Sequence, residues 1–258
     1  MTLLGRRWTP ANLLFALLSL AGGVAFAYPF WAPPGLGANQ VRPALFLFSG
    51  ALALILLALL SEAQEGLTAQ TVAMLGTLVG LNTALRMVDN LVPLPGGFSP
   101  VFLLIALVGY VFGARLGFLM GTLTLLVSDP VSPGGLGPWT PYQMLAAGWV
   151  GLGAAFVPKR TGVWGLAAYA ALWGWLFGAL TNLYFWPYAL GAPDISWQPG
   201  LGLGATLARY GRYYLVTSLA WDSMRAVGNL VLLVALGPSL VKVLDRFRRR
   251  VHVVWEPA

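Results

Sequence analysis

Cysteine is absent from the sequence, histidine occurs once, and charged residues are scarce. Without thiols the chain has no thiolate nucleophile, iron–sulfur cluster or thiolate metal site. The single His252, in the tail, argues against histidine-based acid–base chemistry and metal binding. Charged residues make up 9% of the 258 positions, against about 25% in a typical soluble domain. Hydrophobic residues make up 58%, so the composition predicts a polytopic membrane protein.

The apolar runs divide into eight predicted helices, because a membrane-spanning helix needs about 20 mostly apolar residues. Two blocks, 98–128 and 141–188, are too long for one span and contain breaks around Arg115 and at 158–162. The predicted fold class is therefore an all-α polytopic membrane protein. Its helices are expected at residues 11–31, 43–61, 68–88, 99–112, 115–128, 141–157, 162–187 and 213–241.

The 15 Lys and Arg residues outnumber the 8 acidic residues and give a net charge of +7. In a membrane protein this excess reports orientation, because cytoplasmic loops are enriched in Lys and Arg. The sequence thus predicts a multi-pass protein of the cell (plasma) membrane with cytoplasmic N- and C-termini, in contact with the lipid bilayer. No nucleic-acid partner is expected, since no basic face occurs outside the tail. The basic residues assigned to the cytoplasmic side are Arg6, Arg7, Arg115, Lys159, Arg160 and those of 242–250.

Small residues recur at helical spacing in three predicted helices. Residues four apart share one helix face, so such strips allow another helix to approach closely. Most strips of this kind serve packing within one chain, and the sharper hypothesis is that at least one docks a separate membrane subunit. The strips are Ala69, Ala73, Gly76 and Gly80; Gly113, Gly117 and Gly121; and Gly174 and Gly178.

Polar residues inside predicted spans are the other candidates, because they are costly in a bilayer and tend to be functional. Asn82, Arg86 and Asp89 lie toward the outer end of helix 68–88, and Asn182 lies within 162–187. Asp222 and Arg225 are three residues apart and can pair on one helix face, either as a structural ion pair or as a ligand contact. Paired carboxylates at catalytic spacing, phosphate loops and metal clusters do not occur in the sequence. We therefore expect no enzyme, no cofactor and no metal.

Aromatic residues gather near the predicted outer loops 89–99, 128–140 and 188–204, which are rich in proline and glycine. An interfacial aromatic belt explains part of this set. A pocket for a ring-rich organic ligand explains it as well, with Arg209 placed to meet a polar or anionic group. The aromatic candidates are Phe98, Trp139, Tyr142, Tyr184, Trp186 and Tyr213.

Four segments resemble the substrate-binding S component of energy-coupling factor (ECF) transporters, a type of ABC importer. They are GFSP at 97–100, GYVFGARLGFLMG at 109–121, GPWTPYQM at 137–144 and GWVGLG at 148–153. A weaker match follows in GALTNL at 178–183. The GPWTPYQM segment is the most specific of these, and the glycine spacing is weak by itself.

The resemblance implies a membrane subunit that captures a vitamin or related micronutrient, with cobalamin or a precursor favoured. It implies docking onto a membrane T component with two cytoplasmic ATPases, through the positions Ala69, Ala73, Gly76 and Gly80. It also implies an S-component-like core of six helices in residues 62–243, whereas residues 1–61 add two N-terminal helices and 244–258 a basic tail. The substrate-binding candidates are Asn82, Arg86, Asp89, Phe98, Trp139, Tyr142, Gln143, Asn182, Tyr184, Trp186, Arg209, Tyr213 and Arg225.

A stand-alone, ion-coupled secondary transporter of a small organic solute is the alternative function. Asp89 and the Asp222–Arg225 pair would then be its coupling groups. The absence of detectable inverted repeats in the sequence argues against it. A membrane enzyme acting on lipid ranks lower, because no nucleophile or metal set is recognisable.

Overall fold

The computed structural model describes residues 10–32, 49–50, 53, 56, 67–91, 99–189 and 191–253, and side chains from 16 to 249 within these ranges except 89–91. Every regular element in this part of the chain is helical. The α-helices are α1 (Pro10–Trp31), α3 (Ala69–Leu91), α4 (Val101–Phe112), α5 (Ala114–Ser128), α6 (Thr140–Ala154), α7 (Gly162–Phe185), α8 (Leu203–Thr217) and α9 (Leu219–Val253). Short 3-10 helices are η3 (Asp129–Val131), η4 (Lys159–Thr161) and η5 (Trp186–Tyr188).

Three helical segments are long and apolar enough to cross a membrane: Ala69–Val88, Lys159–Tyr188 and Leu219–Arg249. The segments Ala16–Trp31 and Val101–Phe112 are apolar but shorter. The hydrocarbon core of a bilayer is about 30 Å thick, which a helix crosses in about 20 residues. The structure therefore supports the composition-based prediction of a helical membrane protein.

Most predicted helices agree closely with the observed ones. The helices α1 and α3 to α7 each begin within two residues of their predicted starts. The chain breaks around Gly113 and at residues 155–161 lie where an apolar block was divided in the sequence. The prediction for residues 43–61 falls mostly outside the described residues.

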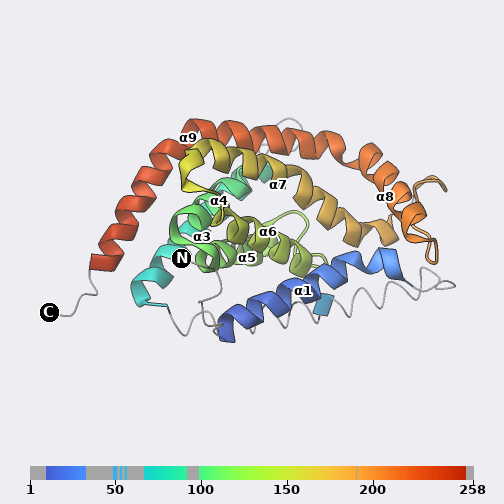
Figure 1. Cartoon of the computed structure of the whole chain (residues 1–258), viewed down its shortest axis with the longest axis horizontal. Helices are drawn as coiled ribbons and strands as arrows, with labels where there is room; N and C mark the ends of the chain where they lie inside the picture. The colour runs from blue at the N-terminus through green and yellow to red at the C-terminus, as the bar shows by residue number, and fades with distance from the viewer. Residues whose placement is uncertain are drawn as a thin grey trace.

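The last predicted helix differs from the structure. Residues 213–241 do not form one helix, because the chain breaks at Ser218 (φ −134°, ψ −28°) between α8 and α9. The helix α9 then continues through Val253, into the residues predicted to form a separate tail. Pro238 lies inside α9, where it lacks the N–H for the helical bond and crowds the preceding turn. Figure 1 shows that α9 changes direction along its length.

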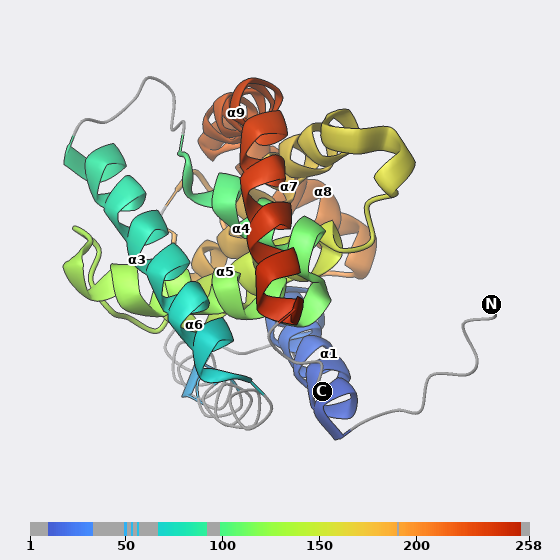
Figure 2. The same cartoon turned by 90° about the vertical axis from the view of Figure 1, so that its left-hand side faces the viewer.

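The bundle is built around α4, α5 and α6. Figures 1 and 2 both show α9 along one side of these helices and α1 along the opposite side. Figure 2 shows α3 on one flank and α7 on the other. The helix α1 packs on α6, α7 and α8, and the indole Nε1 of Trp149 in α6 donates to Ser19 Oγ of α1 at 3.0 Å. This first helix is thus part of the packed core.

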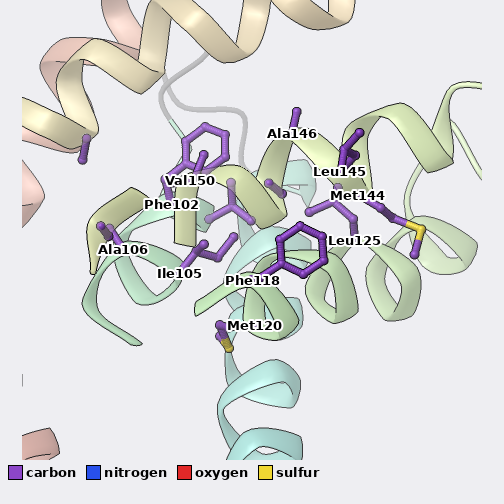
Figure 3. Packing of buried hydrophobic residues seen from close by; sticks show 14 of the residues in the cluster. Phe102, Ile105, Ala106, Phe118, Met120, Leu125, Met144, Leu145, Ala146 and Val150 are labelled. Atoms are coloured by element: carbon purple, nitrogen blue, oxygen red, sulfur yellow. The ribbon is translucent and has the colours of Figure 1, made fainter. Parts of the chain in front are cut away.

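The helix α4 is buried almost completely. Of its residues, only Phe112 is not buried, and a helix that is apolar all round belongs at the centre of a fold. Figure 3 shows its side chains Phe102, Ile105 and Ala106 in one cluster with residues of α5 and α6. The helix is short, about 18 Å at 1.5 Å per residue, which is less than the thickness of the hydrocarbon core of a bilayer.

Glycine permits the closest helix contacts in this core. A Cβ atom on Gly117 or Gly151 would overlap the other residue's carbonyl group, and one on Gly121 would overlap the backbone of Ala147. A Cβ atom on Gly174 would lie 2.5 Å from Ala226 Cα of α9. Gly117, Gly121 and Gly174 therefore pack within the chain, as the simpler interpretation of these two strips predicts.

Candidate functional site

Asn82 joins three helices. Its side chain is completely buried, and its Nδ2 donates to Val101 O at 3.0 Å and to Thr124 Oγ1 at 3.2 Å. These bonds hold α3 against the first turn of α4 and the middle of α5. The Asn82 Oδ1 atom is buried and has no hydrogen-bond partner among the described residues. Because a buried acceptor costs free energy when it has no donor, this oxygen is suited to accept from a bound polar group.

One turn further along α3, Arg86 forms an ion pair across the bundle. Its Nη1 lies 2.6 Å from Asp129 Oδ1 and also donates to Ser128 Oγ. The Asp129 side chain is only 2% exposed, so the guanidinium offsets much of the cost of burying the carboxylate. Asn82, Arg86, Thr124, Ser128 and Asp129 are called the α3 polar group below.

A second polar group lies between α7 and α9. Asn182 Nδ2 donates to Ser218 Oγ at 2.5 Å, at the break between α8 and α9. Arg225 Nη1 lies 2.5 Å from Asp222 Oδ1, so the i,i+3 pair predicted from the sequence is present. A Cβ atom on Gly178 would overlap the buried Asp222 carboxylate, which explains the glycine at this contact. Asn182, Ser218, Asp222 and Arg225 are called the α7–α9 polar group.

The first turn of α4 lies between these two groups. Val101 O accepts from Asn82 of the α3 polar group. The ring of Phe102 packs on Phe177 of α7, with centroids 4.9 Å apart. The Arg225 guanidinium in turn lies 5.8 Å from the centroid of the Phe177 ring. The α3 polar group and the α7–α9 polar group, which are far apart in the sequence, therefore both lie near the first turn of α4.

Aromatic residues from five helical segments, α1, α6, α7, η5 and α8, pack on one another in two sets of three. Tyr142 of α6 packs on Phe26 of α1 at 5.0 Å and on Tyr184 of α7 at 4.6 Å between centroids. Trp186 packs on Tyr210 of α8 at 5.1 Å and on Tyr213 at 6.1 Å. Burial, followed by the effect of neighbouring tyrosines, raises the pKa of Tyr210, so its hydroxyl stays protonated and donates to Ala179 O. These six residues are called the aromatic cluster.

Two residues predicted to contact the ligand instead donate hydrogen bonds to backbone carbonyl groups of the same chain. Trp186 is fully buried, and its Nε1 donates to Ile195 O at 2.8 Å. Arg209 donates to Ser196 O at 3.0 Å and to Pro193 O. Both residues therefore hold the segment between α7 and α8 in place, a role that the sequence did not indicate.

The other predicted substrate-binding residues make few contacts in the structure or lie outside the described residues. Trp139 is half-buried, with its ring centroid 6.2 Å from that of Phe185. Gln143 is half-buried one turn along α6. The side chain of Asp89 and all of Phe98 lie outside the described residues. Sequence reasoning did not select Ser128 or Asp129 as site residues; the only signal was an acidic residue next to a proline in a predicted outer loop.

The small-residue strip on α3 differs from the other strips. Ala69, Ala73, Gly76 and Gly80 are all exposed. A Cβ atom on Gly76 or Gly80 would meet no atom of the described residues within 4 Å. This face of α3 is therefore open within the described part of the chain.

The described residues offer no set of three His, Cys, Asp or Glu side chains that could hold a metal ion. Polar groups, arginines and aromatic rings are what this end of the bundle provides, and together they suit binding of an organic molecule. No family model, curated protein or solved structure matches the chain.

Proposed function

We propose that the chain is the substrate-capturing membrane subunit of an ATP-driven ECF importer for a vitamin or related micronutrient, with cobalamin or a precursor favoured. It would dock on a membrane T component with two cytoplasmic ATPases. In this proposal the chain is multi-pass in the plasma membrane with both termini cytoplasmic. Its core of six helices lies within residues 62–243, and α1, the first of the two predicted N-terminal helices, braces that core.

The open strip on α3 is the observation that carries this proposal. Small residues on α5, α6 and α7 are occupied by contacts within the chain, whereas Gly76 and Gly80 face open space among the described residues. A smooth, small-residue face lets a second helix approach closely in a membrane. The helix α1 packs on α6, α7 and α8 and lies on a different side of the bundle from α3 (Figure 2). Among the described residues, α1 therefore leaves the strip on α3 free for a T component.

The end of α4 near the two polar groups is the proposed ligand site. Asn82 contributes a buried oxygen that has no donor among the described residues, and Arg86 and Arg225 each keep guanidinium nitrogens outside their ion pairs. The GPWTPYQM segment places Trp139, Tyr142 and Gln143 at the start of α6. Stacking rings with a few polar donors and acceptors are suited to a ring-rich ligand that also carries polar groups.

Replacing Gly76 by Leu tests the docking face. The added side chain should keep a partner helix from approaching α3, so tagged chain purified from its native membranes should lose the T component and the ATPases. Ligand binding should persist. Gly23→Leu is the matched control, because Gly23 of α1 is exposed and a Cβ there also meets nothing within 4 Å. Equal partner recovery with both variants would refute the assignment of this face.

The Asp222–Arg225 pair, whose carboxylate is buried, supports the second candidate, a stand-alone ion-coupled transporter. Ionisable pairs within membrane spans are common in ion-coupled carriers. Proteoliposomes that contain only this chain discriminate between the two functions. Solute uptake driven by a proton or sodium gradient would support the carrier, whereas uptake that requires the T component and ATP would support the S component.

A further inference from the structure

Three cations lie on one face near the end of α9. Lys242, Arg246 and Arg249 are exposed, and their i, i+4, i+7 spacing places them on one side of the helix over about 10 Å. Together with Asp245 they line an open depression in the surface. This geometry presents several cationic donors to a single anionic group.

A second element brings further cations to the same end of the bundle. Lys159 of η4 donates through Nζ to Tyr110 O, and its ammonium lies 3.3 Å from the centroid of the Tyr110 ring. Arg248 of α9 donates to Val111 O at 3.0 Å. Both side chains thus bind carbonyl groups in the last turn of α4, where the helix dipole favours cations. Arg248 is also paired with Asp245 at 3.2 Å.

Large apolar side chains are exposed beside these cations. Val243 and Phe247 of α9 are 59% and 47% exposed, and Phe156 and Trp164, on either side of η4, are 72% and 70% exposed. Exposed aromatic residues at the ends of apolar helices are typical of a membrane interface. Residues 219–241 of α9 cover about 34 Å, slightly more than the hydrocarbon core. Lys242 is therefore the first residue after the segment of α9 that would cross the hydrocarbon core.

We propose that Lys242, Arg246 and Arg249 form a binding site for the headgroup of an anionic phospholipid. The lipid phosphate would occupy the depression on α9, and the exposed side chains of Val243 and Phe247, on the neighbouring side of the helix, would contact the glycerol and the first acyl carbons at the membrane interface. The alternation of cations and apolar residues on one helix favours a lipid over an acidic protein surface, because an acidic protein would leave the apolar residues without a partner. Asp245 limits the net positive charge of the site.

Titration of the full-length chain in a non-ionic detergent with fluorescent phosphatidylglycerol and phosphatidylcholine tests this site. The wild-type chain should prefer phosphatidylglycerol. The triple variant Lys242→Gln/Arg246→Gln/Arg249→Gln should lose that affinity by on the order of 100-fold, about five-fold for each cation. Asp245→Asn should bind more tightly, which provides an independent readout if the triple variant does not fold. Arg212→Gln is the control, since Arg212 is exposed on α8, far along the chain from this site.

Three results would overturn the proposal. The first is equal affinity of the wild-type chain for the two lipids. The second is unchanged phosphatidylglycerol affinity in the triple variant; if that variant also lost the ATPases on purification, the face would be a protein-docking surface instead. The third is competition by inorganic phosphate as effective as that by phosphatidylglycerol, which would show that the acyl chains make no contribution. None of these readouts depends on the transport function proposed above.

Discussion

Single polar side chains hold distant parts of this bundle together. The sequence alone predicts Asn82 and Arg86 as functional candidates, because polar groups inside apolar helices are costly whatever the fold. Their partners Thr124 and Asp129 are about 40 residues away, and only the packing of α3 on α5 brings them together. The Asp222–Arg225 pair could be predicted, because both residues lie on one helix turn. Pairs within one helix turn can therefore be predicted from sequence spacing, whereas pairs between distant helices cannot.

Arg86→Met should destabilise the protein by about 3–5 kcal/mol, because it leaves the buried Asp129 carboxylate without its cation. Denaturation in mixed micelles with SDS would measure the change in unfolding free energy. The double variant Arg86→Met/Asp129→Leu should recover most of the loss, since it removes both charges. Arg212→Met should have little effect, because Arg212 is exposed and, among the described residues, donates only to Ala208 O of its own helix. A double variant as unstable as Arg86→Met would contradict the ion-pair explanation.

The helix α4 could be predicted from its sequence pattern, but its place in the bundle could not. Its apolar run predicted a helix, but a run with no polar face does not indicate which neighbours surround it. The break at Ser218 was missed for a similar reason: neither glycine nor proline marks it, and tertiary contacts such as the Asn182–Ser218 bond accompany it. The small-residue strips could be located, but only the packing distinguishes the occupied strips from the open one.

The last turn of α4 is expected to depend on its two basic partners. Lys159→Met/Arg248→Met would leave the Tyr110 and Val111 carbonyl groups without these donors. The double variant should lose about 1–3 kcal/mol of unfolding free energy, measured in the same mixed micelles. Arg160→Met is the control, because Arg160 is exposed in the same 3-10 helix. If both variants lost stability equally, the capping role would be wrong and general loss of charge would explain the effect.

For the whole molecule, scarcity of charge predicted the class of protein, and the structure supports it with three helices able to cross a membrane. Composition is sufficient at this scale because a bilayer imposes the same requirement on every spanning helix. It does not specify how helices pack, so the convergence of two polar groups on the start of α4 could not be foreseen. The same arrangement separates three features: a polar and aromatic end, an open face on α3 and a basic end of α9.

Calorimetric titration of the purified chain with a panel of vitamins and precursors, cobalamin among them, tests the central claim most directly. We expect saturable binding of one member of the panel at a single site. Trp139→Ala and Asn182→Ala should weaken it about tenfold, the equivalent of one stacking contact or hydrogen bond. Leu172→Ala, at an exposed position of α7, should leave the affinity unchanged. If no member of the panel binds saturably, the chain is not the substrate-capturing subunit of a vitamin importer.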